Sequence, residues 1–179
     1  MPKQRKKLLL VDGYNVLRSG SRYQRIAGPD YTDDTFNTAR EALINDVVNY
    51  AGRDWRAVIV FDGAKNRFST GEAETVGGVR IVFSPAGQSA DKVIEKLAHD
   101  ARERQVETLV VTSDATIQDT VFGNGVDRMS ADGFSHEVTL YYEDARLDET
   151  PKVAEKNTVA ARIDPATLAK LQAPRDRAR

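Results

Sequence analysis

The 179-residue chain contains no cysteine and only two histidines, His99 and His136. Without cysteine there can be no disulfide, no thiolate metal site and no cysteine nucleophile. Two histidines also argue against a histidine-rich zinc site. Any metal centre in this chain must therefore be built mainly from oxygen ligands.

Long apolar runs and a strong net charge are also missing. No segment approaches the ~20 apolar residues of a membrane span. The run Leu8–Val11, after a basic start, is shorter than the ~7–15 residue core of a secretory signal. We therefore expect a cytoplasmic protein with no membrane partner. The formal net charge of −1 gives no global attraction to nucleic acid, so a polyanion must be held by local basic patches and by metal.

Length and composition favour one folded domain. Hydrophobic residues make up 40% of the chain and charged residues 30%, which is ordinary for a globular protein. We assign residues 1–148 to this domain. After Asp148 the chain becomes polar and alanine-rich, so we predict that residues 149–179 form a C-terminal extension. Within it, Asp164-Pro165 could start a short helix.

Three short apolar runs each lead into an aspartate. Leu8–Val11 precedes Asp12, Val58–Phe61 precedes Asp62, and the run beginning at Leu109 reaches Asp114. Runs of this length, separated by helix-patterned stretches, are typical of buried parallel strands. The carboxyl ends of parallel strands share one edge of the sheet, where ligands bind in open α/β folds. The pattern therefore predicts an α/β fold with several carboxylates at one edge.

The remaining patterns predict the other elements. Loops are expected at 20–30, which is polar and basic, and at 63–78, which lacks periodicity. Further strands are expected at 79–83, 108–112 and 126–129, and the second strand covers 55–61. Helices are expected at 15–19, from 32 or 33 to about 51, from Ser89 to about 104, from 114 to about 122, and from 131 to about 145.

Two more carboxylates enter through the helix that begins at Ser89. Asp91 and Glu95 are four residues apart and therefore lie on one face of the helix. Each acid also has an ordinary explanation: Asp91 and Glu95 could belong to a solvated face, and a strand-end aspartate could simply cap a turn or helix. The coincidence of all five favours a shared site. Asn15 could orient a carboxylate, a metal-bound water or a phosphate, or serve a local turn.

Carboxylate ligands without histidine or cysteine select Mg²⁺ or Mn²⁺. Such ions usually keep several waters and bind together with substrate phosphates. One or two of them can supply hydroxide and neutralise the charge of a phosphodiester. Phosphodiester hydrolysis by metal-activated water needs no nucleophilic side chain. The sequence therefore favours a metal-dependent phosphodiesterase.

A series of motifs adds a resemblance to a known family. The first is Leu-Leu-Leu-Val-Asp12-Gly13-Tyr14-Asn15. The others are Ala39-Arg40-Glu41-Ala42-Leu43-Ile44, Val-Ile-Val-Phe61-Asp62, Val82-Phe83-Ser84, Ala90-Asp91-Lys92-Val93-Ile94-Glu95, Val111-Thr112-Ser113-Asp114 with Gln118, and Arg128-Met129-Ser130-Ala131. In order and spacing, over roughly residues 7 to 146, they resemble the YacP-like family of NYN domains, relatives of PIN-domain nucleases.

The resemblance implies a PIN-like three-layer α/β/α sandwich with a central, mainly parallel sheet. It also implies an Mg²⁺- or Mn²⁺-dependent endoribonuclease, since the family includes ribosome-associated enzymes that cut messenger RNA during translation. On matching positions, Asp12, Asp91 and Asp114 would be catalytic metal ligands. Asp62 and Glu95 would bind the metal directly or through water, and Asn15 would support catalysis. The chain departs from the family in the residues Gly63-Ala64 after Asp62 and in the tail beyond Asp148.

Two predicted loops could hold RNA near the same edge of the sheet. Cations contact phosphates, and aromatic rings stack on unpaired bases. Any single arginine among them is more simply explained as an ordinary solvent-exposed loop residue. The candidate RNA-binding residues are Tyr14, Arg18, Arg22, Tyr23 and Arg25 after the first strand, and Lys65 and Arg67 after the second.

Competing functions leave different traces in the sequence. A non-catalytic RNA- or ribosome-binding module with the same fold is the main alternative, although all the acids of the enzyme are present. A haloacid-dehalogenase-type phosphatase would need a second aspartate at position 14, where this chain has tyrosine. A dinucleotide-binding protein would need a Gly-x-Gly-x-x-Gly motif after Val11, which is absent. The RNA target and the oligomeric state stay open.

Overall fold

The computed structural model describes residues 6–63, 73–117 and 119–149. The chain divides into two compact units, Met1–Tyr142 and Glu143–Arg179. The first unit contains the sheet and the helices around it. Of the second unit, only the end of the last helix is described. The short helix predicted at Asp164-Pro165 lies outside the described residues.

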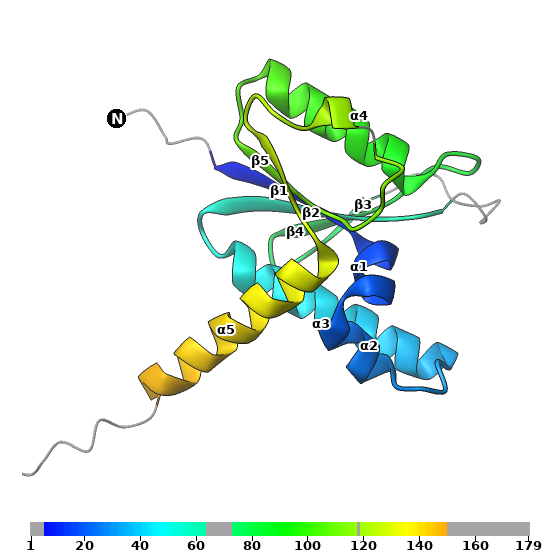
Figure 1. Cartoon of the computed structure of the whole chain (residues 1–179), viewed down its shortest axis with the longest axis vertical. Helices are drawn as coiled ribbons and strands as arrows, with labels where there is room; N and C mark the ends of the chain where they lie inside the picture. Colours follow the sequence, from blue (N-terminus) through cyan, green and yellow to red (C-terminus); the bar gives the residue numbers. More distant parts are fainter. Residues whose placement is uncertain (1–5, 64–72, 118, 150–179) are drawn as a thin grey trace, which may run out of the picture. The chain divides into compact units, whose positions relative to one another are not determined.

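The centre of the first unit is a six-stranded sheet with the order β3-β4-β2-β1-β5-β6 (Figure 1). All neighbours pair in parallel except β3 and β4, which are antiparallel. The strands are β1 (Lys7–Asp12), β2 (Trp55–Phe61), β3 (Ala73–Val76), β4 (Val79–Phe83), β5 (Thr108–Val111) and β6 (Val126–Met129). The mainly parallel sheet predicted from the apolar runs is confirmed.

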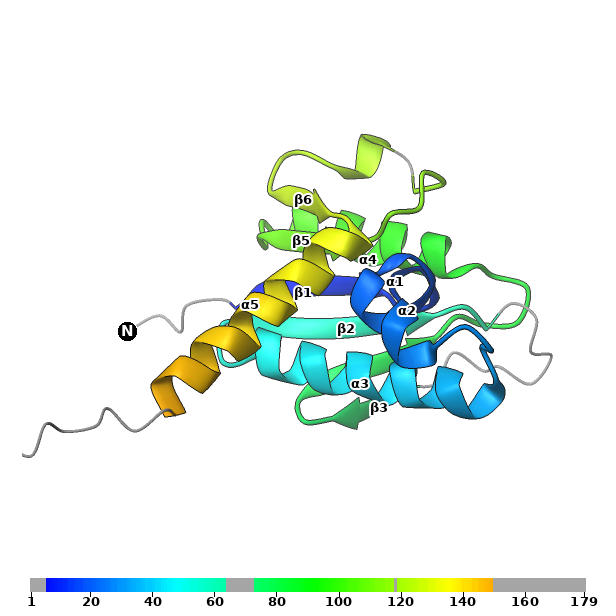
Figure 2. The same cartoon turned by 60° about the horizontal axis from the view of Figure 1, so that its bottom comes forward.

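Helices cover both faces of the sheet. One face carries α1 (Gly13–Ser19), α2 (Ser21–Ala27), α3 (Asp33–Ala51) and the start of α5 (Ala131–Glu149), and the other carries α4 (Ala90–Glu103). Figure 2 shows α3 and α4 on opposite sides of β1 and β2. Among these helices of the described residues, none combines the length and apolar character that crossing a bilayer requires.

Alternation along β1 divides the core into two clusters. Leu9 and Val11 face α3 and α5, whereas Leu8 and Leu10 face α4. Because successive side chains of a strand point to opposite faces, a strand buried on both sides must be apolar at every position. The three-layer α/β/α sandwich follows directly from this pattern.

The connections between strands create a crevice at one edge of the sheet. From β1 the chain passes through α1, α2 and α3 to β2, and then through the β3–β4 hairpin. It then crosses the other face through α4 to β5, on the opposite side of β1. The order therefore reverses between β1 and β5, and ligands of open α/β sheets bind outside the carboxyl ends of strands at such a point.

Two of the predicted loops contain regular structure. Within 20–30, residues Ser21–Ala27 form α2. The prediction of a loop was wrong because the exposed arginines hide a helical spacing: Tyr23 and Ala27 are buried and four residues apart. Within 63–78, residues Ala73–Val76 form β3, and residues 64–72 lie outside the described residues.

The helix predicted from 114 to about 122 is also wrong. In the described part of that segment only Asp119–Val121 is helical, as one short 3₁₀ turn. The backbone after β5 is held instead by contacts with α1 and β6, described below. The neighbouring helices and strands begin and end within a few residues of the predicted positions.

Candidate metal centre

Three aspartates from separate elements meet at the carboxyl edge of the sheet. Asp12 ends β1, Asp91 lies in the first turn of α4, and Asp114 follows β5. Each offers a carboxylate oxygen, and these three oxygens all lie within 4.8 Å of one another. The structure therefore brings together three of the five carboxylates that were predicted to bind metal.

The segment after β5 is held in place by hydrogen bonds from both sides. The Ser113 N–H donates to the Asn15 side-chain oxygen at 2.7 Å. The Arg128 guanidinium donates to the carbonyl oxygens of Thr112, at 3.2 Å, and Asp114, at 3.0 Å. The backbone that carries the Asp114 carboxylate is thus fixed to α1 on one side and to β6 on the other.

Two hydroxyl groups connect the carboxylates to one another. Thr112 donates from Oγ1 to Asp12 at 3.1 Å, and the same oxygen accepts the Asp114 N–H at 3.0 Å. Thr116 donates its hydroxyl to Asp91, while its N–H donates to Asp114 at 2.9 Å. The turn role considered for Asp114 is therefore real, but it uses only one of the two carboxylate oxygens.

Asp12 is the most buried of the three, with 5% of its surface exposed. Burial, with repulsion from Asp91 and from Asp114, raises the pKa of Asp12 from 3.8 to about 6. The Thr112 hydroxyl and the Asn15 backbone N–H oppose this shift by stabilising the charged carboxylate. An aspartate with this pKa is poorly stabilised as an anion by the protein alone, and a bound cation would relieve it.

The carboxylates open onto a cavity of about 270 Å³. Asp62, at the end of β2, lies on its wall, as do Arg18 and Tyr14 from α1. In the part of the chain that the structure describes, no lysine or arginine forms an ion pair with Asp12, Asp91 or Asp114. Three clustered carboxylates without an ion-paired cation among the described residues match the oxygen-rich coordination that Mg²⁺ and Mn²⁺ prefer.

The other predicted metal ligands differ in position. Asp62 is exposed and shares the cavity, but its oxygens do not belong to the three-carboxylate group. Glu95 lies one turn further along α4, does not line the cavity, and pairs with Lys92 at 3.4 Å. Direct ligation by Asp62 or Glu95 therefore stays a prediction.

The predicted RNA-binding residues fall into different surroundings. Arg18 is exposed on the cavity wall, with its guanidinium 5.9 Å from the ring centre of Tyr14. Tyr14 is partly buried and packs on Phe61, with the ring centres 5.0 Å apart. Arg25 is exposed but does not line the cavity. Lys65 and Arg67 lie outside the described residues.

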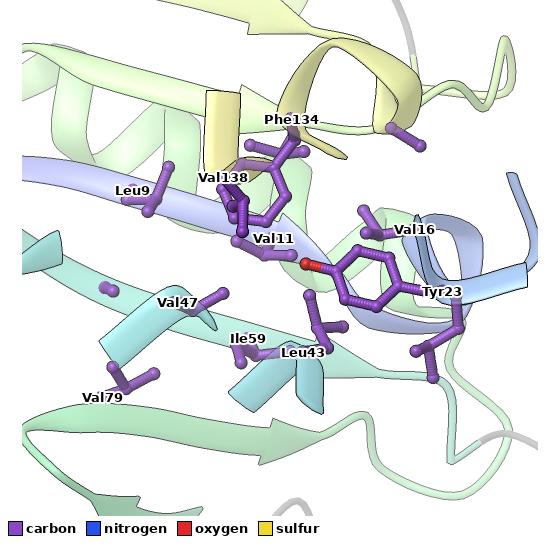
Figure 3. Packing of buried hydrophobic residues seen from close by; sticks show 14 of the residues in the cluster. Leu9, Val11, Val16, Tyr23, Leu43, Val47, Ile59, Val79, Phe134 and Val138 are labelled. Carbon is purple, nitrogen blue, oxygen red and sulfur yellow. The ribbon is translucent and has the colours of Figure 1, made fainter. Parts of the chain in front are cut away.

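Arg22 and Tyr23 require a correction. The Tyr23 ring is fully buried in the core, close to Val16 and Leu43 in Figure 3, so it offers no face for stacking on a base. The Arg22 Nε donates to the buried Asp46 carboxylate at 2.8 Å. Both side chains hold α2 against α3, because the amphipathic helix that carries them replaces the expected loop.

The groups that support the site were not predicted from the sequence. Thr112 follows β5 and is fully buried, but its hydrogen bond to Asp12 depends on the pairing of β5 with β1 and leaves no signal in the sequence. Thr116 follows Asp114 by two residues, which is typical of a local side-chain turn. Arg128 carried no such signal, because its reach to Thr112 depends on the pairing of β6 with β5.

Comparisons with known proteins agree with this geometry. The chain is 32% identical, over 131 residues, to the protein YacP of Bacillus subtilis (strain 168), which is described as uncharacterized; the match covers 73% of this chain and 74% of the relative. It also matches two crystal structures of Rae1 (YacP) from Bacillus subtilis, each with a TM-score of 0.63. One is 26% identical and covers 92% of both chains. The other, a single-substitution mutant, is 27% identical and covers 92% of this chain and 97% of that one.

A family model gives the broadest match. The model of the YacP-like NYN domain matches residues 9–176. The match thus extends beyond the stretch on which the sequence resemblance rested and into the segment after Asp148. NYN domains are PIN-like nucleases, and the clustered aspartates and the sandwich fold are those expected of such a protein. The chain belongs to the YacP-like NYN domain family.

Proposed function

We propose that this chain is an Mg²⁺- or Mn²⁺-dependent endoribonuclease that hydrolyses phosphodiester bonds of single-stranded RNA. Messenger RNA on the ribosome is the substrate that the family resemblance suggests, and the cytoplasm is the corresponding location. The observation that carries the proposal is the meeting of Asp12, Asp91 and Asp114 on one cavity without an ion-paired cation among the described residues.

The residues present fit a hard divalent ion. All three candidate ligands are carboxylates, and their oxygens are close enough to share one ion. Asp12, Asp91 and Asp114 would hold it. Asp62 lies on the same cavity wall and would accept a hydrogen bond from a water bound to the ion. When bound, such an ion supplies an ionised water and neutralises charge on a phosphodiester.

The chain's own groups position the substrate and the carboxylates. Thr112 and Asn15 orient Asp12 and the segment that carries Asp114. Arg18 is the exposed cation on the cavity wall and is placed to contact a phosphate of the bound RNA. Tyr14 presents a partly buried ring beside it. Arg25, Lys65 and Arg67 remain proposed contacts for more distant phosphates.

The reaction is hydrolysis by water rather than attack by the RNA's own 2′-hydroxyl. Neither His99 nor His136 lines the cavity, so no imidazole is available there to remove a 2′-hydroxyl proton. Attack by water breaks one P–O bond and leaves one phosphate monoester and one hydroxyl. We therefore expect products without a 2′,3′-cyclic phosphate.

Manganese binding, measured by calorimetry, tests the site directly. The wild type should bind Mn²⁺, and the double variant Asp12→Asn with Asp114→Asn should lose this binding while keeping its circular dichroism spectrum. Asp127→Asn is the matched control, because Asp127 is an exposed aspartate of β6 that does not line the cavity. It should bind Mn²⁺ like the wild type.

Failure of the wild type to bind Mn²⁺, even with a short RNA present, would overturn the metal site. The protein would then be better explained as a non-catalytic RNA- or ribosome-binding module. Equal loss of binding in Asp127→Asn would also count against the proposal, because it would mean that general surface charge, and not the cavity, attracts the ion.

A further inference from the structure

The edge of the sheet opposite the aspartates carries a concave, cationic surface. Because five of the six strands are parallel, their amino ends meet at this other edge. Lys6 precedes β1 there, and Arg56 is the second residue of β2. In Figure 2, β1 begins near the N label and runs toward α1, so the two edges lie at opposite ends of the strands. The function proposed above does not use this surface.

Three neighbouring clefts, which we call the amino-edge clefts, make up the surface. The largest has a volume of about 750 Å³, and Lys6, Arg56 and Arg104 lie on its wall. A second cleft of about 560 Å³ shares Lys6 with it and adds Arg53 and Trp55. A third cleft, of about 450 Å³, shares Arg56 and Arg104 and adds Arg80. Shared walls make the three clefts one continuous surface.

The cations of the amino-edge clefts come from four separate parts of the chain. They include Lys6 just before β1, Arg56 near the start of β2, Arg80 near the start of β4, and Arg104 just after α4, and all four are exposed. Within the described residues, Arg56 and Arg80 form no side-chain hydrogen bond or ion pair. The fold, rather than a local run of basic residues, thus gathers positive charge on one surface.

Nearby acids only partly balance this charge. Glu107 pairs with Lys7 at 2.8 Å, and Asp54, Asp100 and Glu103 also lie on the cleft walls. By contrast, the cavity at the carboxyl edge contains four aspartates and one arginine. Among the described residues, positive charge thus exceeds negative charge in the amino-edge clefts, and negative charge exceeds positive charge in the carboxyl-edge cavity. A polyanion is therefore attracted to the amino-edge clefts more than to the metal-free cavity.

We propose that the amino-edge clefts bind the phosphate backbone of single-stranded RNA, as a second RNA contact remote from the aspartates. The inference rests on the proposed function, because it takes RNA to be the substrate of this chain. Several cations spread over adjoining clefts suit a chain of regularly spaced phosphates, each of which can be contacted by a separate lysine or arginine.

Trp55 favours RNA over an acidic peptide as the occupant. Its ring is partly exposed on the wall of the second cleft, and the Lys7 ammonium lies 5.7 Å from the ring centre. An aromatic ring beside cations is the combination that proteins use for unpaired bases, which stack on the ring while the cations hold the backbone. A polyglutamate chain has charges but no bases to stack.

The fluorescence of Trp55, the only tryptophan of the chain, can report RNA binding in the clefts. We would titrate the full-length protein with a single-stranded RNA of about 12 nucleotides and follow tryptophan fluorescence in EDTA. Without metal there is no cleavage, and because Trp55 lies on the wall of the second cleft its fluorescence reports binding at the amino edge. The expected result is saturable quenching that weakens as salt is raised, with no comparable quenching by polyglutamate.

Two cleft arginines supply the test variant. The double variant Arg56→Ala with Arg80→Ala removes two predicted phosphate contacts, each of which contributes about 0.7 to the slope of log K against log salt for single strands. Binding should therefore weaken by about 25-fold at about 0.1 M salt, with a slope lower by about 1.4. Lys96→Ala is the control, because Lys96 is an exposed lysine of α4 that lines none of the three clefts.

Three results would overturn this proposal. The first is absence of RNA binding by the wild type at low salt, and the second is equal weakening by Lys96→Ala and by the cleft variant. The third is quenching by polyglutamate as strong as by RNA, which would identify an acidic protein as the occupant. Failure of the proposed nuclease function is separate, since it would appear as lost Mn²⁺ binding at Asp12 and Asp114 while RNA still bound in EDTA.

Discussion

At the scale of single residues, Asp12 best illustrates how the site lowers the folding stability of the metal-free protein. Its carboxylate is 5% exposed and faces two other acids, and no lysine or arginine of the described residues forms an ion pair with it. A buried anion without a counter-ion opposes folding, and here the cost appears as a pKa raised to about 6. A site kept at this cost to stability is typical of a functional residue.

The raised pKa of Asp12 predicts how the stability of the metal-free protein depends on pH. The folded state binds the proton more tightly than the unfolded state, so its stabilising contribution is complete below pH 4 and is lost as pH rises through about 6. Asp12→Asn removes this dependence. In EDTA at pH 7.5 the variant should be more stable than the wild type by about 3 kcal/mol, as measured by urea unfolding, and the difference should disappear near pH 3, below the unfolded pKa.

Asp127→Asn again serves as the control and should leave unfolding unchanged at both pH values, because Asp127 is exposed. Added Mn²⁺ should then stabilise the wild type but not Asp12→Asn. If Asp12→Asn were instead destabilising at pH 7.5 in EDTA, the carboxylate would have a stabilising partner that the structure does not contain, and the present explanation of the site would fail.

The three clustered aspartates could be predicted from the sequence, whereas the residues that hold them in position could not, for a physical reason. The strand-end positions of Asp12 and Asp114 are visible as the ends of apolar runs, and Asp91 as a residue of the first helical turn. Thr112 and Arg128 could not be found in this way, because their partners are set by strand pairing between segments far apart in the sequence. Side-chain hydrogen bonds across elements leave no periodic signal.

At the scale of elements, the segment after β5 is positioned by β6. Arg128 donates to two carbonyl oxygens of that segment, and its guanidinium lies 5.6 Å from the ring centre of Phe122. The contact fixes the backbone around Asp114 without touching the carboxylate. Arg128 is therefore a positioning residue, and its effect should be seen in metal affinity.

Arg128→Met should keep the fold but weaken Mn²⁺ binding by about 10- to 100-fold, the range typical of groups that orient metal ligands. Calorimetry measures this affinity, and Arg80→Met is a suitable control, since Arg80 is an exposed strand arginine at the opposite edge of the sheet. Unchanged affinity in Arg128→Met would mean that Asn15 and Thr112 alone suffice to position the segment.

A second interelement contact joins α2, α3 and α5 around Asp46. This carboxylate, 2% exposed, accepts hydrogen bonds from Arg22 and from the hydroxyls of Tyr23 and Tyr142, both at 2.9 Å. The Arg22 guanidinium also lies 5.3 Å from the ring centre of Tyr142. Removing a partner of a buried carboxylate strongly destabilises a fold, because it leaves a charge uncompensated in the interior.

Arg22→Glu should therefore destabilise the protein by about 3–5 kcal/mol, because it places a second anion beside Asp46. Arg25→Glu, on the exposed side of the same helix, is the matched control and should change the free energy of unfolding by about 0.5 kcal/mol or less. Urea unfolding distinguishes the two. Equal stability of both variants would mean that the contact of Arg22 with Asp46 does not stabilise the fold. Arg22 would then be available for RNA binding, as the sequence suggested.

The elements that were predicted correctly are those with strong periodicity. The buried strands contain continuous apolar runs, and the helix after Ser89 has apolar residues at regular helical spacing. In contrast, β3 is a short edge strand with all four residues exposed, so no apolar pattern marked it. The Gly77-Gly78 pair before β4 was the available signal, because such pairs are typical of tight hairpin turns.

At the scale of the whole molecule, charge is divided between the two edges of the sheet. The carboxyl edge gathers aspartates from three elements, and the amino edge gathers cations from four. A parallel sheet makes this possible, because all strands begin at one edge and end at the other. Composition could not reveal the division, since the two charges nearly cancel over the chain.

The most direct test of the proposed nuclease function is RNA cleavage, followed with end-labelled messenger RNA that is either free or on translating ribosomes. The wild type should cleave RNA internally in a reaction that needs Mg²⁺ or Mn²⁺, stops in EDTA, and leaves no cyclic phosphate. Asp12→Asn with Asp114→Asn should be inactive, and Asp127→Asn should cleave normally. A wild type that binds Mn²⁺ but cuts RNA in neither form, or a double variant that cuts as fast as the wild type, would contradict it.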